Sequence, residues 1–341
     1  MHIIVDAMGG DFAPEAVVAG CKMAVEKLDV TLTLVGREKQ IHREMELCGL
    51  SGDKVQIYNA EDVILGEDDP VEAIRKKKDS SMRVALSLLK DGKGDAVVSA
   101  GNTGALISGA TLLVKRIKGV RRVALAPIMP AIDGCFLLVD AGANAECTPA
   151  FLEQFAIMGS VYMERVMGVN SPRVKLVNIG TEEDKGTPLI AKTHARLKEL
   201  PIAYGGYIEA REIPLGGADV VVCDGFCGNV ILKCMEGMGA GFVQMLKQVF
   251  MKNLVTKAAA GVVRRGLQEL KKSMDYTEYG GAPILGAAKP VIKAHGSSNA
   301  NAFYHAIEQA VSMVEQRVVE ELTGYIENSA ASAESERTEV Q

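Results

Sequence analysis

Short runs of β-branched and aliphatic residues alternate with longer amphipathic stretches along most of the chain. Each short run ends in a turn rich in glycine and small polar residues, as a buried strand does, whereas the longer stretches repeat their apolar residues at helical spacing. The pattern predicts strands near residues 3–5, 30–35, 54–58, 95–99, 122–127, 135–139, 174–179, 220–223 and 290–293. It predicts helices near 14–28, 37–48, 82–90, 105–115, 149–166 and 188–200, a long helical region from 230, and a final helix ending near 323.

This alternation of strand and helix predicts an α/β fold, an α/β/α sandwich with helices on both faces of the sheet. Residues 129–134 fit a hairpin connection between two strands, so we expect a mixed, mostly parallel sheet. No change in composition marks a linker, and residues 1–327 are expected to form a single domain. Residues 328–341 are rich in serine, alanine and glutamate, and we expect a disordered tail there.

Glycine-rich or small polar loops follow five of the predicted strands, at residues 6–11, 99–104, 140–144, 180–187 and 224–229. Ligands of open α/β sheets bind beyond the carboxyl ends of the strands, where we expect these loops to lie. The loop at 99–104, Ser-Ala-Gly-Asn-Thr-Gly, joins a predicted strand to a predicted helix. Backbone N–H groups in such a loop can hold an anion, often a phosphate. The loops together predict one shared anion site.

Three polar side chains in or near these loops are candidates for chemistry. Lys185 can hold a phosphate or polarise a carbonyl, and Asn229 can donate a hydrogen bond to an oxyanion. Simpler interpretations stay open: Lys185 as a solvated surface lysine, Asn229 as an ordinary helix N-cap and His295 as a structural histidine. Cys227 has no adjacent base that would activate it as a nucleophile.

Motifs typical of several other enzyme classes are absent from the sequence. Residues 180–187 are not a Walker loop, because the lysine precedes the second glycine, and no G-x-G-x-x-G follows the first strand. The glycines at 237–241 lie inside a predicted helix, where close packing explains them. There is no H-E-x-x-H, zinc-ligand spacing or G-x-S-x-G elbow. These absences disfavour kinases, NAD-dependent dehydrogenases, metallohydrolases and esterases, and we predict no metal site.

Composition narrows the setting of the protein. The chain has 341 residues, of which 48% are hydrophobic, enough for a large core. A net charge of −5 argues against a nucleic-acid binder. The seven cysteines form no C-x-x-C pair, which indicates reduced thiols in a cytoplasmic protein. No apolar run reaches the ~18 residues of a membrane span, although peripheral membrane contact stays open.

One segment, residues 246–272, combines apolar and basic residues with a single acidic one, Glu269. Its apolar positions do not keep one stripe past Gly261 and Gly266, so we expect two shorter helices. A basic amphipathic segment suits an anionic membrane surface or an acidic protein partner, and a subunit interface with a solvated rim is the alternative. The candidate docking residues are Lys252, Leu254, Val255, Lys257, Val262, Arg264, Arg265 and Lys271.

Six loops carry a resemblance to a known family: Asp6-Ala-Met-Gly-Gly-Asp11, Ser99-Ala-Gly-Asn-Thr-Gly104, Asp140-Ala-Gly-Ala-Asn144, residues 178–187, Asp224-Gly-Phe-Cys-Gly-Asn229 and His295-Gly-Ser-Ser298. In this order they resemble the bacterial PlsX family, phosphate acyltransferases of phospholipid synthesis that use acyl carrier protein. The resemblance runs from residue 1 to about 325. At position 227 the family is expected to have threonine or valine more often than cysteine.

The resemblance implies a fold similar to isopropylmalate dehydrogenases and phosphate acetyltransferases. It implies a homodimer that works without a cofactor at the inner surface of the cell membrane, beside a downstream glycerol-phosphate acyltransferase. Lys185 and Asn229 match positions regarded as catalytic. The matching loops supply the candidate substrate-binding residues Asp6, Gly9, Gly10, Ser99, Gly101, Asn102, Thr103, Gly104, Asn144, Thr187, Asp224, Gly228, His295 and Ser298.

These residue types fit the implied chemistry, attack of inorganic phosphate on a thioester. A thiolate leaves readily, so the reaction mainly needs a positioned anion and a stabilised oxyanion. We expect direct transfer without an acyl-enzyme. Three alternatives stay open: an acyltransferase that uses coenzyme A, an NAD-dependent dehydrogenase of similar fold, and a membrane scaffold without activity.

Overall fold

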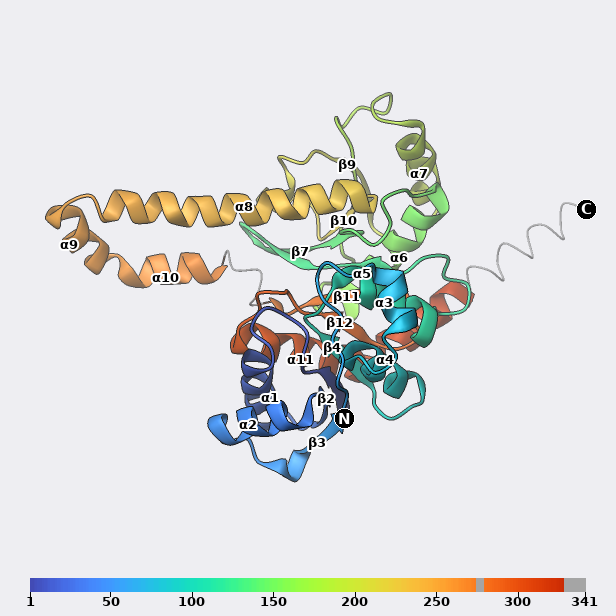
Figure 1. Ribbon diagram of the computed structural model, residues 1–341. Coiled ribbons are helices and arrows are strands. Elements are labelled where there is room, and N and C mark those ends of the chain that lie inside the picture. The colour runs from blue at the N-terminus through green and yellow to red at the C-terminus, as the bar shows by residue number, and fades with distance from the viewer. Residues whose placement is uncertain (274–278, 328–341) are drawn as a thin grey trace, which may run out of the picture.

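A seven-stranded sheet and a five-stranded sheet carry the fold in the computed structural model, which describes residues 1–273 and 279–327 (Figure 1). The order in the first sheet is β3 (Val55–Asn59), β2 (Thr31–Gly36), β1 (His2–Asp6), β4 (Ala96–Ser99), β12 (Val291–Lys293), β11 (Ala282–Leu285) and β5 (Ala124–Leu125). In the second it is β6 (Ile128–Ala131), β7 (Gly134–Val139), β10 (Val220–Val222), β8 (Val174–Val177) and β9 (Tyr204–Ile208).

Both sheets are parallel except at one edge. The antiparallel pairs are β12–β11 and β11–β5 in the first sheet and β6–β7 in the second. The predicted α/β class and the mixed, mostly parallel pairing are therefore confirmed. The division of the strands between two sheets is a feature that the sequence pattern did not predict.

Two apolar layers hold the sheets together, because successive residues of a strand point to opposite faces. In β1, Ile3 belongs to one buried cluster and Ile4 to the other. In β7 of the second sheet, Leu137 joins the cluster of Ile3, and Leu138 joins the cluster of Ile4. Each layer thus runs across both sheets.

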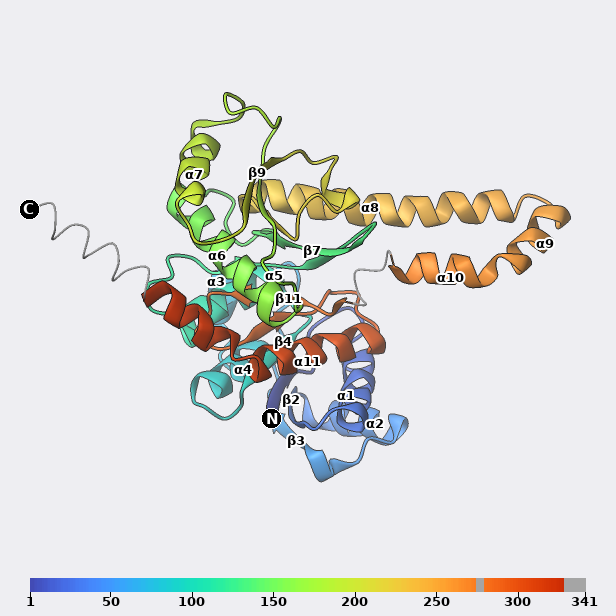
Figure 2. The same cartoon turned by 180° about the vertical axis from the view of Figure 1, so that it is seen from behind.

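Helices cover both faces of the sheets (Figures 1 and 2). One face of the first sheet carries α1 (Glu15–Lys27), α2 (Glu38–Cys48) and α11 (Ala300–Glu315), and the other carries α3 (Pro70–Lys76), α4 (Ser81–Lys90) and α5 (Thr103–Gly109). The second sheet packs against α6 (Pro149–Arg165), α7 (Pro188–Lys198) and the start of α8 (Gly225–Phe250). Helices α1 and α11 of the first sheet and helix α6 of the second pack into one core. In it, Gln309 of α11 donates to the Tyr162 hydroxyl of α6 at 2.7 Å.

The hairpin differs in position from its prediction. Its first strand is β6, so residues 129–131 lie in the strand, and the predicted strand at 122–127 keeps only β5, which pairs in the other sheet. The chain changes sheet at Pro127, which has no N–H group to donate. Its carbonyl accepts from Leu138, while Ala126 beside it donates to Pro283 of the first sheet. Strands β9 and β11 were not predicted, because glycines in β9 and a proline in β11 obscure the strand pattern.

A helical arm projects from the molecule (Figures 1 and 2). Helix α8 extends far past the second sheet, and α9 (Leu254–Val262) and α10 (Arg264–Ser273) fold back from its end. The segment 246–272 is therefore broken, as expected, but at residues 251–253 and at Val263 rather than at Gly261 or Gly266.

The expected tail at 328–341 lies outside the described residues. Within 1–273 and 279–327, no helix is both long and apolar enough to cross a bilayer.

Candidate functional site

The loops after β1, β4 and β12 meet at one edge of the first sheet, because these strands are parallel neighbours. Their close approach requires glycine: a Cβ on Gly9 would lie 2.6 Å from the Gly101 nitrogen. Gly10 has φ +105°, and a Cβ on it would lie 3.1 Å from the Gly296 carbonyl oxygen. The same oxygen accepts from the Asp11 N–H at 2.8 Å. The three loops therefore form one continuous surface.

Asp6, the last residue of β1, is a buried carboxylate beneath this surface. It accepts a hydrogen bond from the Ser99 hydroxyl at 2.6 Å, and that hydroxyl accepts from the Gly101 N–H at 3.1 Å. Burial raises the pKa of Asp6, and the hydrogen bonds to the carboxylate oppose the shift. Both Asp6 and Ser99 are fully buried, so they fix the loops rather than face a ligand.

Lys293, the last residue of β12, was missed by the sequence analysis. Only 8% of it is exposed, and its Nζ donates to the Ala100 carbonyl at 3.3 Å and to the Ala294 carbonyl. Burial lowers the pKa of Lys293 to about 8, although the nearby carboxylates of Asp6 and Asp11 raise it. The sequence offered one signal, a lysine at the end of an apolar strand. A lysine is rarely buried unless it has polar partners, so this position indicates a site where other polar groups meet it.

A second buried carboxylate, Asp140, organises the loop after β7. Its oxygens accept from the backbone N–H groups of Gly142, Ala143 and Asn144 at 2.7–3.2 Å, and from the N–H of Leu125 in the first sheet at 3.0 Å. Burial raises the pKa of Asp140, while these hydrogen bonds act in the opposite direction. One side chain thus ties the glycine loop of the second sheet to a strand of the first.

The loop after β10 turns directly into α8. Asp224 is the N-cap, and its carboxylate accepts from the Cys227 N–H at 2.8 Å. The alternative interpretation of Asn229 as the helix N-cap is wrong, because the helix begins at Gly225 and Asn229 lies in its second turn. Gly228 packs so closely that a Cβ would lie 1.9 Å from the Asp140 carbonyl oxygen. This contact places the Asn229 side chain against Gly142.

A cavity of about 770 Å³ lies between these loops, large enough for a substrate. Its polar lining comes from the glycine-rich loops of both sheets and from Lys293, His295, Asn229, Lys233 and Glu236. Its apolar lining comes from Val63, Ile64, Leu65, Ile107, Leu125, Pro127, Ile128 and Leu232. One site therefore combines glycine-rich loops and basic side chains with an apolar wall.

A polar cluster joins α8 to the loop after β12 within this cavity. Glu236 is largely buried, and its carboxylate accepts from Lys233 at 2.7 Å and lies 3.9 Å from His295 Nε2. On the other side of the ring, His295 Nδ1 lies 2.8 Å from the Ser297 hydroxyl. Burial lowers the pKa of His295, and Glu236 opposes the shift. His295 is therefore held between two elements of the site.

Lys185 does not line the cavity. It is exposed in the loop after β8, where its backbone N–H donates to the Glu182 carbonyl at 3.2 Å and its carbonyl accepts from the Asn178 amide at 3.2 Å. Thr187 lies in the same loop and caps α7, accepting from the Ile190 N–H at 3.4 Å. Thr187, a predicted substrate-binding residue, therefore has a structural role as the N-cap of α7 and does not line the cavity.

The structure brings together most of the residues predicted for the site. Those that line the cavity are Gly10, Gly101, Asn102, Thr103, Gly104, Asn229 and His295. Those that lie behind the lining and hold its loops are Asp6, Gly9, Ser99, Asn144, Asp224, Gly228 and Ser298. In the described part of the chain, no group of three or more histidine, cysteine, aspartate or glutamate residues could hold a metal ion.

Comparison with known proteins identifies the family. The model of the family described as "Fatty acid synthesis protein" matches residues 1–321. The chain is 48% identical over 323 residues to a phosphate acyltransferase of Alkaliphilus oremlandii, covering 95% of this chain and 96% of that one. The chain belongs to the PlsX family of phosphate acyltransferases. A phosphate acyltransferase of Clostridium botulinum is 47% identical over 329 residues, covering 96% and 98% of the two chains.

Solved structures of low sequence identity share the fold of this phosphate acyltransferase. A phosphotransacetylase from Streptococcus pyogenes matches with a TM-score of 0.63 at 16% identity, covering 93% of this chain and 94% of that one. A 4-hydroxythreonine-4-phosphate dehydrogenase from Klebsiella pneumoniae matches with a TM-score of 0.51 at 14% identity, covering 92% and 99%. The expected fold relationship to phosphate acetyltransferases is therefore confirmed.

Replacement of Lys293 by methionine is expected to change how stability depends on pH. The unfolded chain keeps the lysine proton up to its ordinary pKa of 10.5, whereas the folded protein releases it near pH 8. Between these values the unfolded state binds more protons, so this lysine makes the wild type more stable as pH rises. The melting temperature of the wild type, relative to Lys293→Met, should increase from pH 7 to pH 9.5.

Lys289→Met is the matched control, because Lys289 also donates to a backbone carbonyl, that of Leu89 at 2.9 Å. A wild-type advantage over Lys293→Met that stays constant or shrinks as pH rises would contradict the lowered pKa of Lys293.

Proposed function

We propose that this phosphate acyltransferase makes acyl phosphate from fatty acyl-carrier protein and inorganic phosphate. The single observation that supports the proposal is the composition of the cavity lining, which combines glycine-rich loops, a source of backbone hydrogen-bond donors, and the buried Lys293 with an apolar wall. The donors and the cation suit a phosphate, and the apolar wall suits a fatty acyl chain. In the proposal, phosphate and the acyl group meet in this one cavity.

In the proposed reaction, a phosphate oxygen attacks the thioester carbonyl carbon and the carbonyl becomes an oxyanion. The carbon–sulfur bond then breaks, the carrier thiolate leaves with the electron pair, and the product is the mixed anhydride of acid and phosphate. The Asn229 amide, which lies beside Gly142, donates to the oxyanion. The loops at 10–11 and 101–104 hold the phosphate, and Lys293 fixes a positive charge behind them.

Lys185 keeps its proposed catalytic role as a second cation for phosphate, carried by the exposed loop at 178–187. Its exposure and its position outside the cavity lining mean that this loop must approach the site when substrate binds. Lys185 and Lys293 are thus proposed to supply positive charge differently, the first from a loop that approaches the bound anion and the second from a fixed, buried position.

Incubation with acyl-carrier protein and phosphate is expected to give a product that reacts with hydroxylamine. Acyl-coenzyme A as donor, assayed in parallel, separates the proposal from the coenzyme A alternative. Asn229→Ala should lower kcat by about 10²–10³-fold without lowering the melting temperature, because it removes one oxyanion donor. Gln244→Ala, which removes an exposed amide from the same helix, is the control.

Hydroxylamine-reactive product from acyl-coenzyme A but not from acyl-carrier protein would contradict the proposed donor. Equal effects of Asn229→Ala and Gln244→Ala would contradict the oxyanion role.

We also propose that the helical arm mediates assembly and docking. Along α8, apolar side chains are exposed, so we assign this helix to the homodimer interface: Phe226, Val230, Met238, Phe242, Val243, Met245 and Val249.

At the end of the arm, Leu254, Val255 and Val262 are 79–86% exposed, which suits insertion into a lipid surface. The adjacent basic residues Lys252, Lys257, Arg264 and Arg265 are exposed as well and suit anionic headgroups or the acidic carrier. Lys271 lies in α10, but its side chain falls outside what the structure describes.

The double substitution Leu254→Asp and Val262→Asp should abolish co-sedimentation with phosphatidylglycerol vesicles and leave acyl phosphate formation in solution unchanged. Leu47→Asp, at an exposed leucine of α2, is the matched control and should keep vesicle binding. Arg264→Glu with Arg265→Glu should raise the KM for the carrier several-fold and weaken vesicle binding by about 1 kcal/mol per residue removed. Unchanged vesicle binding in the apolar double variant, or an unchanged carrier KM after charge reversal, would contradict the corresponding part of the proposal.

A further inference from the structure

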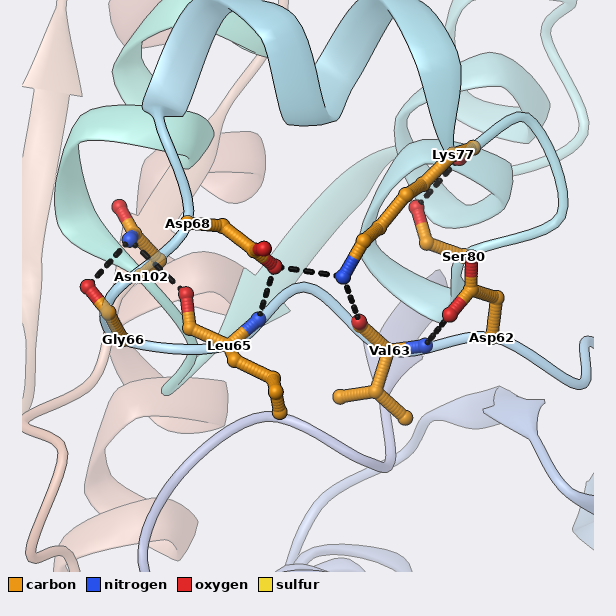
Figure 3. A network of polar contacts seen from close by, with 8 residues as sticks. All are labelled: Asp62, Val63, Leu65, Gly66, Asp68, Lys77, Ser80 and Asn102. Atoms are coloured by element: carbon orange, nitrogen blue, oxygen red, sulfur yellow. Dashed lines mark hydrogen bonds and ion pairs between the residues drawn. The ribbon is translucent and has the colours of Figure 1, made fainter.

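Residues 62–69 form a strap between β3 and α3, and Figure 3 shows the polar contacts that hold it. The strap supplies one side of the cavity. Three consecutive apolar residues of the strap line it: Val63, Ile64 and Leu65. Ile64 is buried, whereas Leu65 is 49% exposed beside the cavity. A half-exposed leucine at the edge of an apolar wall can gain burial when an apolar ligand arrives.

One side chain, Asn102, links this strap to the loop at 99–104, which is called the phosphate loop below (Figure 3). Its Nδ2 donates to the carbonyl oxygens of Leu65 and Gly66 at 3.1 and 3.0 Å. Its Oδ1 accepts from the Ala105 N–H at 2.9 Å and so caps α5. The amide of Asn102, a predicted substrate-binding residue that lines the cavity, is therefore hydrogen-bonded within the protein.

An ion pair closes the strap from the other side. Lys77 Nζ lies 2.6 Å from the Asp68 carboxylate and donates to the Val63 carbonyl at 3.0 Å (Figure 3). The same carboxylate accepts from the Leu65 N–H at 2.7 Å. Both charged side chains are only about a quarter exposed, so the pair is shielded more than an ordinary surface ion pair.

The far end of the strap is packed against the phosphate loop as well. Asp69 caps α3, accepting from the Glu72 N–H at 2.8 Å, and Pro70 begins that helix. A Cβ on Gly104 would lie 2.7 Å from Pro70 Cγ, so α3 and α5 are in close contact. The strap and the loop at 99–104 therefore keep a fixed separation.

We propose that Leu65 determines which acyl chains this enzyme accepts, and that Asn102, Asp68 and Lys77 are positioning residues that hold it. The inference rests on the proposed function, because it takes the fatty acyl group as the ligand of the apolar wall. The strap sets the distance between that wall and the phosphate loop. The thioester of a chain that lies along Leu65 is thus presented to phosphate, whereas a chain that does not fit the wall is not.

A smaller and a larger residue at position 65 should change the acyl selectivity in opposite directions. Leu65→Ala widens the apolar wall and should raise the kcat/KM ratio of long to short saturated acyl-carrier proteins by about tenfold, whereas Leu65→Trp should lower it. Leu112→Ala, at a leucine of similar exposure (46%) outside the cavity, is the matched control and should leave the ratio unchanged. An unchanged ratio in both Leu65 variants overturns the inference.

The positioning residues are tested by comparing the KM for the acyl donor with the KM for phosphate. Lys77→Met should raise the KM for the acyl donor several-fold and leave the KM for phosphate unchanged, which a general loss of stability would not do. A rise in the phosphate KM alone would assign the strap to phosphate binding and overturn the inference.

Equilibrium binding of long and short fatty acids, measured by calorimetry, separates this inference from the proposed function. If no acyl phosphate forms but Leu65→Ala alters the preference between these fatty acids, the proposed function fails and the strap keeps its role. If acyl phosphate forms and Leu65 affects neither turnover nor binding, the proposed function stands and this inference fails.

Discussion

Two buried carboxylates, Asp6 and Asp140, are the constraint on which the site depends. Asp6 is the last residue of β1 in the first sheet, and Asp140 directly follows β7 in the second. Each is satisfied by donors from the loop that follows it or lies beside it. A buried carboxylate without such donors would be strongly destabilising, so the loops must keep the conformations that supply them. Asp140 also accepts from Leu125 of the first sheet, so the two halves of the cavity are joined by a hydrogen bond as well as by apolar packing.

This arrangement explains how one cavity can be suited to two unlike substrates. Parallel strands bring their loops to the same edge, and close glycine contacts let the loops touch, so the glycine-rich loops form one surface there. The strap at 62–69 brings an apolar wall to the same place, and Asn102 fixes its position relative to the donors. In the proposed reaction, the loops that line the cavity hold phosphate and the thioester in position, and the exposed loop that carries Lys185 approaches them when substrate binds.

Much of the fold could be predicted from the sequence, because β-branched runs followed by glycine loops give strong local signals. The pairing of β5 with β11 could not, since it depends on contacts between residues far apart in the chain. For the site, the loops were identified, but the sequence did not indicate that the side chains of Asp6, Ser99 and Asn102 are hydrogen-bonded within the protein. Lys293 was missed because its burial depends on β12 lying beside β4, a pairing of residues far apart in the chain.

Direct attack of phosphate on the thioester leaves the enzyme without an acyl group at every stage, and intact-protein mass spectrometry during a single turnover measures this. The enzyme is mixed with one equivalent of acyl-carrier protein, with and without phosphate, and quenched over the time course of product formation. We expect unmodified enzyme at every time and acyl phosphate only when phosphate is present. An acylated enzyme that forms without phosphate, and decays to acyl phosphate as fast as turnover when phosphate is added, would contradict the account.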